Sequence, residues 1–227
     1  MLRPDTVIFD LDGTLVDSAP DLAAATAFVM TGRGLAAPRT SEIRNFVGGG
    51  AHKMLERAFE DAGATITEKE FETAHAEFLD YYAAHLVERT RPFPSAREAL
   101  TVLRQRGEAL GVCTNKYESY SVDILQALEL DTCFGAVLGG DSLKVRKPDG
   151  GHILGVVERL GGDPARAVMV GDSAADVNAA HDAGVPVIAV SFGYTPVPAS
   201  QLGADRVIDS FAELVAAVDS VRAGARS

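Results

Sequence analysis

Two aspartates follow the first apolar run of the chain and are spaced to share a divalent cation. The run Thr6-Val7-Ile8-Phe9 leads directly into Asp10-Leu11-Asp12-Gly13. On an extended chain, side chains two residues apart face the same way, so Asp10 and Asp12 form a pair of carboxylates. Such a pair is mutually repulsive, and a hard, oxygen-seeking ion such as Mg²⁺ relieves the repulsion. A solvated acidic turn after a strand is the alternative interpretation.

Polar residues also follow later apolar runs. Thr114 and Asn115 come after one such run, and Asp172 comes after another. In an open α/β sheet, ligands bind outside the carboxyl ends of the strands. We therefore expect Asp10, Thr114 and Asp172 to deliver an acid, a hydroxyl and an acid to a single crevice.

Short apolar runs recur along the chain and are typical of strands that are buried on both faces of a parallel sheet. They lie at residues 6–9, 109–113, 136–138, 167–170, 187–190 and 207–208. Helical patterns separate them, and two of these patterns open with capping-box sequences at Ser95 and Ser210. The alternation from residue 93 onward predicts β-α-β units, and hence an α/β fold with a doubly wound parallel sheet.

The segment from residue 18 to residue 90 differs, because it contains no strand-like run. Two helical patterns fill its first part, and a capping box at Thr67 opens a third helix. We therefore predict a core made of residues 1–17 and 91–227, with an all-helical insertion at residues 18–90.

The composition of the chain limits its partners. The 227 residues include 21 Lys and Arg against 32 Asp and Glu, a net charge of −11, and 47% of them are hydrophobic. This is enough apolar material for a core, while the acidic balance argues against binding to nucleic acid or to an anionic membrane. No apolar run is long enough for a membrane helix, and the first run is too short for a signal peptide, so we expect a cytoplasmic protein.

Four motifs in a fixed order give the chain a resemblance to the haloacid dehalogenase-like (HAD) superfamily. They are Asp10-Leu11-Asp12-Gly13-Thr14, Thr114-Asn115, Lys147-Pro148 and Gly171-Asp172-Ser173-Ala174-Ala175-Asp176. The insertion at residues 18–90 resembles the mobile helical cap of that superfamily. The resemblance covers nearly the whole chain and implies a Rossmann-like core, with the cap closing over the strand ends.

The resemblance also implies roles for the aspartates. Asp10 would be a nucleophile that attacks phosphorus, and Asp12 would protonate the leaving group and later deprotonate water. A Mg²⁺ cofactor would be held by Asp172, by the side chain of Asp10 and by the backbone carbonyl of Asp12. Asp176 and Ser173 would support this metal site. For Asp176, an acid that complements the dipole at a helix start is the alternative.

Other motif residues would bind the phosphate group. The resemblance implies that Thr114 and Asn115 bind phosphate oxygens, for which a capped turn is the alternative. It makes Thr14 a substrate contact and Lys147 a catalytic cation. Without the motif, the basic stretch 144–147 would be interpreted as a solvated loop.

The cap contains further candidates for substrate binding. The loop Gly48-Gly49-Gly50 precedes a helix, so its N–H groups could contact an anionic substrate. A flexible hinge explains these glycines equally well. Arg44 flanks the loop and could bind a carboxylate of the substrate.

Several segments resemble the phosphoglycolate phosphatase subgroup of the superfamily, notably residues 9–25, 46–50 and 139–143. This resemblance implies a Mg²⁺-dependent phosphomonoester hydrolase that converts 2-phosphoglycolate to glycolate through an aspartyl-phosphate. A sugar phosphomutase, or a phosphatase for another small phosphorylated metabolite, is the main alternative. A dehalogenase and a non-enzymatic phospho-accepting module are less consistent with Asp12. We expect a monomer or a weak homodimer.

Overall fold

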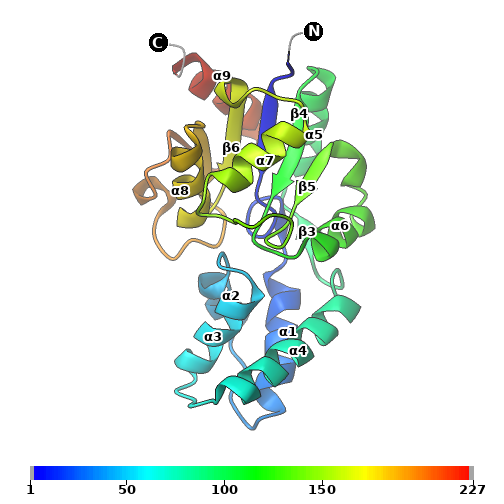
Figure 1. Cartoon of the computed structure of the whole chain (residues 1–227), viewed down its shortest axis with the longest axis vertical. Helices are drawn as coiled ribbons and strands as arrows, with labels where there is room; N and C mark the ends of the chain where they lie inside the picture. The colour runs from blue at the N-terminus through cyan, green and yellow to red at the C-terminus, as the bar shows by residue number, and fades with distance from the viewer. Residues whose placement is uncertain (1–2, 225–227) are drawn as a thin grey trace.

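A six-stranded parallel sheet forms the centre of the fold (Figure 1). The computed structural model describes residues 3–224. In spatial order the strands are β5 (Ala136–Leu138), β4 (Ala109–Cys113), β1 (Thr6–Phe9), β6 (Ala167–Gly171), β7 (Val187–Val190) and β8 (Arg206–Ile208). The direction of the chain order reverses at β1, because β4 lies on one side of it and β6 on the other. The predicted doubly wound parallel sheet is confirmed.

Helices cover both faces of this sheet. They are α5 (Ala96–Gln105), α6 (Glu118–Ala127), α7 (Gly151–Arg159), α8 (Ala174–Ala183) and α9 (Leu214–Gly224), with the short 3₁₀ helices η1 (Asp131–Cys133), η2 (Pro164–Arg166), η3 (Ala199–Gln201) and η4 (Phe211–Glu213). Along β1, Val7 and Phe9 belong to the core cluster that contains residues of α5 and α9. Ile8 belongs to the cluster that contains residues of α7 and α8. Burial on both faces explains why the strands are continuously apolar.

Four helices are grouped apart from the sheet, at the lower end of the view in Figure 1. They are α1 (Ala19–Thr31), α2 (Thr40–Phe46), α3 (Ala51–Asp61) and α4 (Glu68–Ala84). An antiparallel ribbon of β2 (Val16–Asp17) and β3 (Arg91–Pro92) joins them to the core. The inserted all-helical cap is therefore confirmed, and its limits as a separate domain, residues 18–90, stay a prediction.

The two chain segments that enter and leave the cap are held together by Asp21. Its buried carboxylate accepts hydrogen bonds from the backbone N–H groups of Arg89 and Thr90, the latter at 2.8 Å. The hydroxyl of Thr90 donates a further bond at 2.7 Å. The start of α1 is thus fixed against the segment that returns to the core.

Local sequence signals account for some of the helix starts. Thr67 and Glu70 exchange hydrogen bonds as predicted, and this capping box opens α4. The capping box predicted at Ser95 is wrong, because Ser95 has a left-handed backbone with φ of 63° and makes no capping bond. Ser210 accepts a bond from the N–H of Ala212, but the turn it opens is η4 rather than an α-helix.

Among residues 3–224, no helix is long and apolar enough to cross a membrane.

Candidate active site

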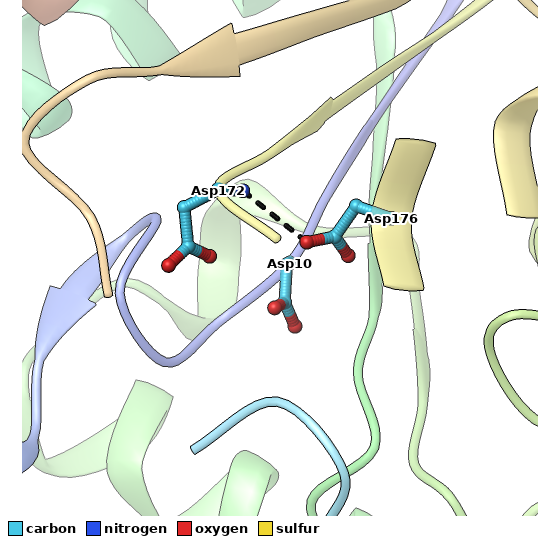
Figure 2. A group of neighbouring side chains, drawn as sticks. All are labelled: Asp10, Asp172 and Asp176. Carbon is cyan, nitrogen blue, oxygen red and sulfur yellow. Dashed lines mark hydrogen bonds between the residues drawn. The ribbon is translucent and has the colours of Figure 1, made fainter. Parts of the chain in front are cut away.

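Three buried carboxylates meet at the carboxyl ends of β1 and β6. Asp10 directly follows β1, Asp172 directly follows β6, and Asp176 lies in the first turn of α8. One oxygen from each lies within 4.8 Å of the others, and Figure 2 shows the side chain of Asp10 lying between those of Asp172 and Asp176 in this view. The backbone N–H of Asp10 donates to the carbonyl of Val170 at 2.9 Å, which aligns the two strand ends. The strand order reverses at this edge of the sheet. Ligands of open parallel sheets bind at such a reversal, outside the carboxyl ends of the strands.

Burial and mutual repulsion make the ionised forms of these acids unfavourable in the absence of a cation. Burial raises the pKa of Asp10 to about 6, with Asp176 and Asp12 adding repulsion and Lys147 opposing it. Burial, followed by repulsion from Asp176 and Asp10, raises the pKa of Asp172 well above its ordinary value. A compact set of carboxylate oxygens with excess negative charge fits a hard divalent cation.

Asp172 is held in place from two sides. Its Oδ1 accepts a hydrogen bond from the hydroxyl of Thr14 at 2.9 Å. Its Oδ2 accepts one from the backbone N–H of Tyr194 at 2.6 Å. The hydroxyl of Thr14 therefore donates its hydrogen bond to Asp172 in this structure. The predicted contact of Thr14 with substrate stays a prediction. Tyr194 was not among the predicted site residues, because it lies in an irregular loop after β7.

Asp176 and Ser173 organise the turn that carries Asp172. The Oδ2 atom of Asp176 accepts hydrogen bonds from the backbone N–H groups of Asp172 and Ser173, at 3.2 and 2.9 Å, and from the Ser173 hydroxyl at 2.6 Å. Its Oδ1 atom pairs with Lys147 at 2.6 Å. Asp176 thus combines a helix-start role with a direct place in the acidic cluster.

Lys147 is the cation at the centre of the cluster. Its ammonium Nζ lies 2.8 Å from Oδ1 of Asp10, and only 2% of its side chain is exposed. Burial alone would lower its pKa, but attraction to Asp10 and Asp176 raises the pKa above its ordinary value. Lys147 therefore stays charged and holds the Asp10 carboxylate in a fixed orientation.

Asp12 lies beside the cluster, and both of its oxygens have partners. Oδ1 accepts a hydrogen bond from the hydroxyl of Ser18 at 2.5 Å, and Oδ2 lies 3.0 Å from Nζ of Lys116. The same ammonium donates to the hydroxyl of Tyr82, on α4 of the cap, at 3.0 Å. Ser18, Lys116 and Tyr82 were not among the predicted site residues. Only Lys116 had a usable signal, because it directly follows the motif Thr114-Asn115 at a strand end.

Thr114 and Asn115 lie at the end of β4. Thr114 is buried and lines the site. The side-chain amide of Asn115 donates to the carbonyl of Gly48 at 2.9 Å and to the carbonyl of Lys147 at 3.0 Å. Both amide hydrogens of Asn115 therefore bind backbone oxygens in this structure. Asn115 joins the cap loop to the lysine loop, and its predicted contact with phosphate stays a prediction.

A cavity of about 90 Å³ opens between the cap and these strand ends. Core residues that line it include Asp10, Asp12, Thr114, Asn115, Lys116 and Arg146. Cap residues that line it include Leu22, Val47, Gly48, Gly50, His52, Met54, Phe78, Leu79 and Tyr82. The cavity thus has charged groups on the core side and a largely apolar wall on the cap side.

The structure brings only part of the predicted cap set to this cavity. Gly48 and Gly50 line it, but Gly49 and Arg44 are not among the lining residues. The guanidinium of Arg44 instead pairs with Asp17 at 2.8 Å and lies over the ring of Tyr194, 5.7 Å from its centroid. Since Asp17 belongs to the ribbon that joins cap and core, Arg44 is placed at the neck of the cap.

The chain is similar to known proteins over most of its length. A family model described as haloacid dehalogenase-like hydrolase matches residues 7–190. The chain is 43% identical over 213 residues to the phosphoglycolate phosphatase of Caulobacter vibrioides, which covers 94% of this chain and 90% of that protein. It is 44% identical over 211 residues to the phosphoglycolate phosphatase of Agrobacterium fabrum, covering 93% and 91%.

A solved structure has the same fold. The crystal structure of a predicted phosphoglycolate phosphatase from Haemophilus somnus matches with a TM-score of 0.88 at 32% identity. The match covers 96% of this chain and 99% of that one. The similarity therefore includes both the sheet that carries the acidic cluster and the helices of the cap.

Proposed function

The chain belongs to the haloacid dehalogenase-like hydrolase family, and we propose that it is a Mg²⁺-dependent phosphatase that hydrolyses 2-phosphoglycolate to glycolate and phosphate. The observation that carries the proposal is the ion pair between Asp10 and Lys147, set within the buried acidic cluster at the strand ends. The names of the relatives at 43% and 44% identity support the choice of substrate.

The acidic cluster fits the metal ion that such chemistry requires. Asp10 and Asp172 offer carboxylate oxygens, and Asp176 holds the turn beside them. The backbone carbonyl of Asp12 would be a further ligand, as the resemblance to the family implies. When bound, Mg²⁺ would neutralise part of the charge on the phosphate and so allow a carboxylate to approach it.

Asp10 acts as the nucleophile in this proposal. Its carboxylate is fixed by Lys147, so one oxygen faces the phosphorus with little loss of side-chain freedom. A bond forms between that oxygen and phosphorus as the bond from phosphorus to the ester oxygen breaks, which leaves an aspartyl-phosphate. The buried hydroxyl of Thr114 is available to bind a phosphate oxygen.

Asp12 acts as the general acid in the first step of this proposal and as the general base in the second. It gives a proton to the departing ester oxygen, so that the alcohol leaves neutral. It then takes a proton from the water that attacks phosphorus, and this releases phosphate and restores Asp10. Ser18 and Lys116 fix the carboxylate of Asp12. In this proposal Asp12 therefore exchanges protons and does not itself attack phosphorus.

The test is phosphate release with and without Mg²⁺ from 2-phosphoglycolate, glucose phosphates, a nucleoside monophosphate and pyrophosphate, with the Asp10→Asn variant as the blank. We expect Mg²⁺-dependent release that is fastest from 2-phosphoglycolate. Release led by another compound would overturn the substrate and keep the phosphatase. No release from any compound would favour a sugar phosphomutase, which interconversion of glucose phosphates would then detect.

A further inference from the structure

Lys116 is a buried cation on the wall of the cavity. Only 6% of its side chain is exposed, and its ammonium Nζ lies 3.0 Å from Asp12 and 3.0 Å from the hydroxyl of Tyr82. The ammonium also lies 4.6 Å from the centroid of the Tyr82 ring. The cation is therefore held between the core and helix α4 of the cap, at the place where the two meet over the site.

The ammonium has more hydrogen-bonding capacity than these contacts use. A lysine ammonium has three donors, and within residues 3–224 its polar partners are Asp12 and Tyr82. One donor is left for a group inside the cavity that Lys116 lines. Burial raises the pKa of Tyr82 to about 12, so the phenol is neutral and adds no negative charge to the cation. Lys116 can therefore bind an anionic group inside the cavity while it keeps its contact with Asp12.

The position of Lys116 matches the part of a substrate that lies next to the reacting phosphate. In the proposed reaction Asp12 lies beside the ester oxygen, and Lys116 contacts Asp12 directly. In 2-phosphoglycolate a single methylene separates the ester oxygen from the carboxylate. An anion so close to the ester oxygen falls within reach of the cation that contacts Asp12. The neighbouring wall of Leu22, Met54 and Phe78 lowers the local dielectric and strengthens such a pair.

We propose that Lys116 binds the carboxylate of the substrate and makes the enzyme selective for phosphomonoesters whose alcohol carries a carboxylate on the carbon next to the ester oxygen. The inference rests on the proposed phosphatase function. Tyr82 acts as a positioning residue, because its hydroxyl and ring fix the ammonium of Lys116 when the cap covers the site.

The other basic side chains of the cavity fit this task less well. Arg146 is exposed, and its guanidinium lies near Gly50 on the cap loop. His52 is exposed and has Glu72 at 3.9 Å. Exposed charges are screened by water and discriminate weakly between charged and neutral groups. Lys116 combines burial, full charge and proximity to Asp12.

The test compares 2-phosphoglycolate with 2-hydroxyethyl phosphate, which has a hydroxymethyl group in place of the carboxylate, by kcat/KM in the presence of Mg²⁺. For the natural chain we expect a preference for the carboxylate of about 100-fold. In Lys116→Met the ratio of the two kcat/KM values should fall to within about threefold, since the matching charge is gone. Lys144→Met, which removes an exposed lysine outside the cavity, should keep the ratio of the natural chain.

Each outcome decides a different question. A natural chain that releases phosphate from neither ester removes the proposed function itself. The role of Lys116 is overturned, and the phosphatase left intact, by a natural chain with no preference or by a Lys116→Met variant that keeps measurable activity with an unchanged ratio. If Lys116→Met is unfolded or inactive with both esters, Tyr82→Phe decides. Its ratio should fall about fivefold, mainly through KM for 2-phosphoglycolate, and an unchanged ratio overturns the inference.

Discussion

Lys147 and Asp10 form a buried ion pair in which Nζ of the lysine lies 2.8 Å from Oδ1 of the aspartate. The same ammonium lies 2.6 Å from Asp176, so one cation serves two of the three carboxylates in the cluster. One positive charge cannot neutralise three negative charges, and the third carboxylate, Asp172, has no cationic side chain among its contacts within residues 3–224. The remaining negative charge is the physical reason why we propose this cluster as the site of the Mg²⁺ ion.

The first prediction concerns Asp10→Asn, which should abolish turnover without unfolding the protein. An amide is not a nucleophile toward phosphorus, so kcat should fall by at least about 10⁴-fold. Without metal, the midpoint of thermal unfolding should stay the same or rise, because the change removes one of three mutually repelling charges. Asp61→Asn, a change of the same type at an exposed position, should leave kcat unaltered. Measurable turnover in Asp10→Asn would exclude Asp10 as the nucleophile.

The second prediction concerns the effect of pH on the stability of the metal-free protein. The pKa of Asp10 is about 6 in the folded protein, above its ordinary value of 3.8, mainly because the group is buried. The folded protein therefore binds more protons than the unfolded chain between about pH 4 and pH 6, and the contribution of Asp10 to stability is lost as the pH rises through this range. Thermal unfolding in a chelator should show this loss, and Asp10→Asn should reduce it.

The third prediction concerns how the stabilisation of the protein by Mg²⁺ depends on pH. In the proposed site the ion binds ionised carboxylates, so Mg²⁺ should stabilise the protein more at pH 7.5 than at pH 4.5, where Asp10 is mostly protonated. At about 100 times its Kd, Mg²⁺ should add about 2.7 kcal/mol at the higher pH. Thermal unfolding with Mg²⁺ or with a chelator at both pH values measures the difference. Equal stabilisation at the two pH values would place the ion outside the acidic cluster.

Most strands of the sheet could be predicted because they are continuous apolar runs, whereas β8 begins one residue before its predicted run, at the exposed Arg206. The run Thr6–Phe9 coincides with β1, and the predicted run at 187–190 coincides with β7. The two-residue strands β2 and β3 could not be predicted, since two residues have no periodicity and the pairing of Val16 with Pro92 depends on how the cap inserts. The backbone of Ser95 was likewise unpredictable from its sequence pattern, because its left-handed conformation depends on the turn before α5.

The residues of the candidate site likewise include some that could be predicted from the sequence and some that could not. Residues at strand ends, such as Asp10 and Asp172, could be placed together because parallel strands bring their carboxyl ends to one edge. Tyr82 and Tyr194 could not, since one reaches the site only when the cap docks and the other lies in an irregular loop. The position of Lys116 at a strand end could be predicted, but its burial could not, because that burial depends on Tyr82 of the docked cap as well as on Asp12.

The fourth prediction concerns Gly13, whose backbone has φ of 83° and which packs against the edge that carries the acidic cluster. A Cβ at this position would overlap Oδ2 of Asp172 and lie 2.9 Å from the ring of Tyr194. Gly13→Ala should therefore cost about 3 kcal/mol of stability, through both backbone strain and overpacking, and should weaken Mg²⁺ binding. Gly107→Ala is the matched control, because its φ is 82° and no atom lies within 4 Å of the added carbon. That control should cost about 1 kcal/mol and leave Mg²⁺ binding unchanged. Equal effects of the two changes on Mg²⁺ binding would contradict the role of Gly13.

The fifth prediction separates two explanations of Arg44. Its sequence position beside the glycine loop predicts a contact with a substrate carboxylate, whereas the structure pairs its guanidinium with Asp17 at the neck of the cap. This pair is partly exposed, and such pairs contribute about 0.5 kcal/mol. Arg44→Ala should therefore change kcat/KM for 2-phosphoglycolate and for 2-hydroxyethyl phosphate by the same small factor, about threefold or less. Lys116→Met is the comparison, because loss of a cation that binds the carboxylate should change the ratio of the two values. A selective loss with 2-phosphoglycolate in Arg44→Ala would mean that Arg44 leaves Asp17 and reaches the substrate when it binds.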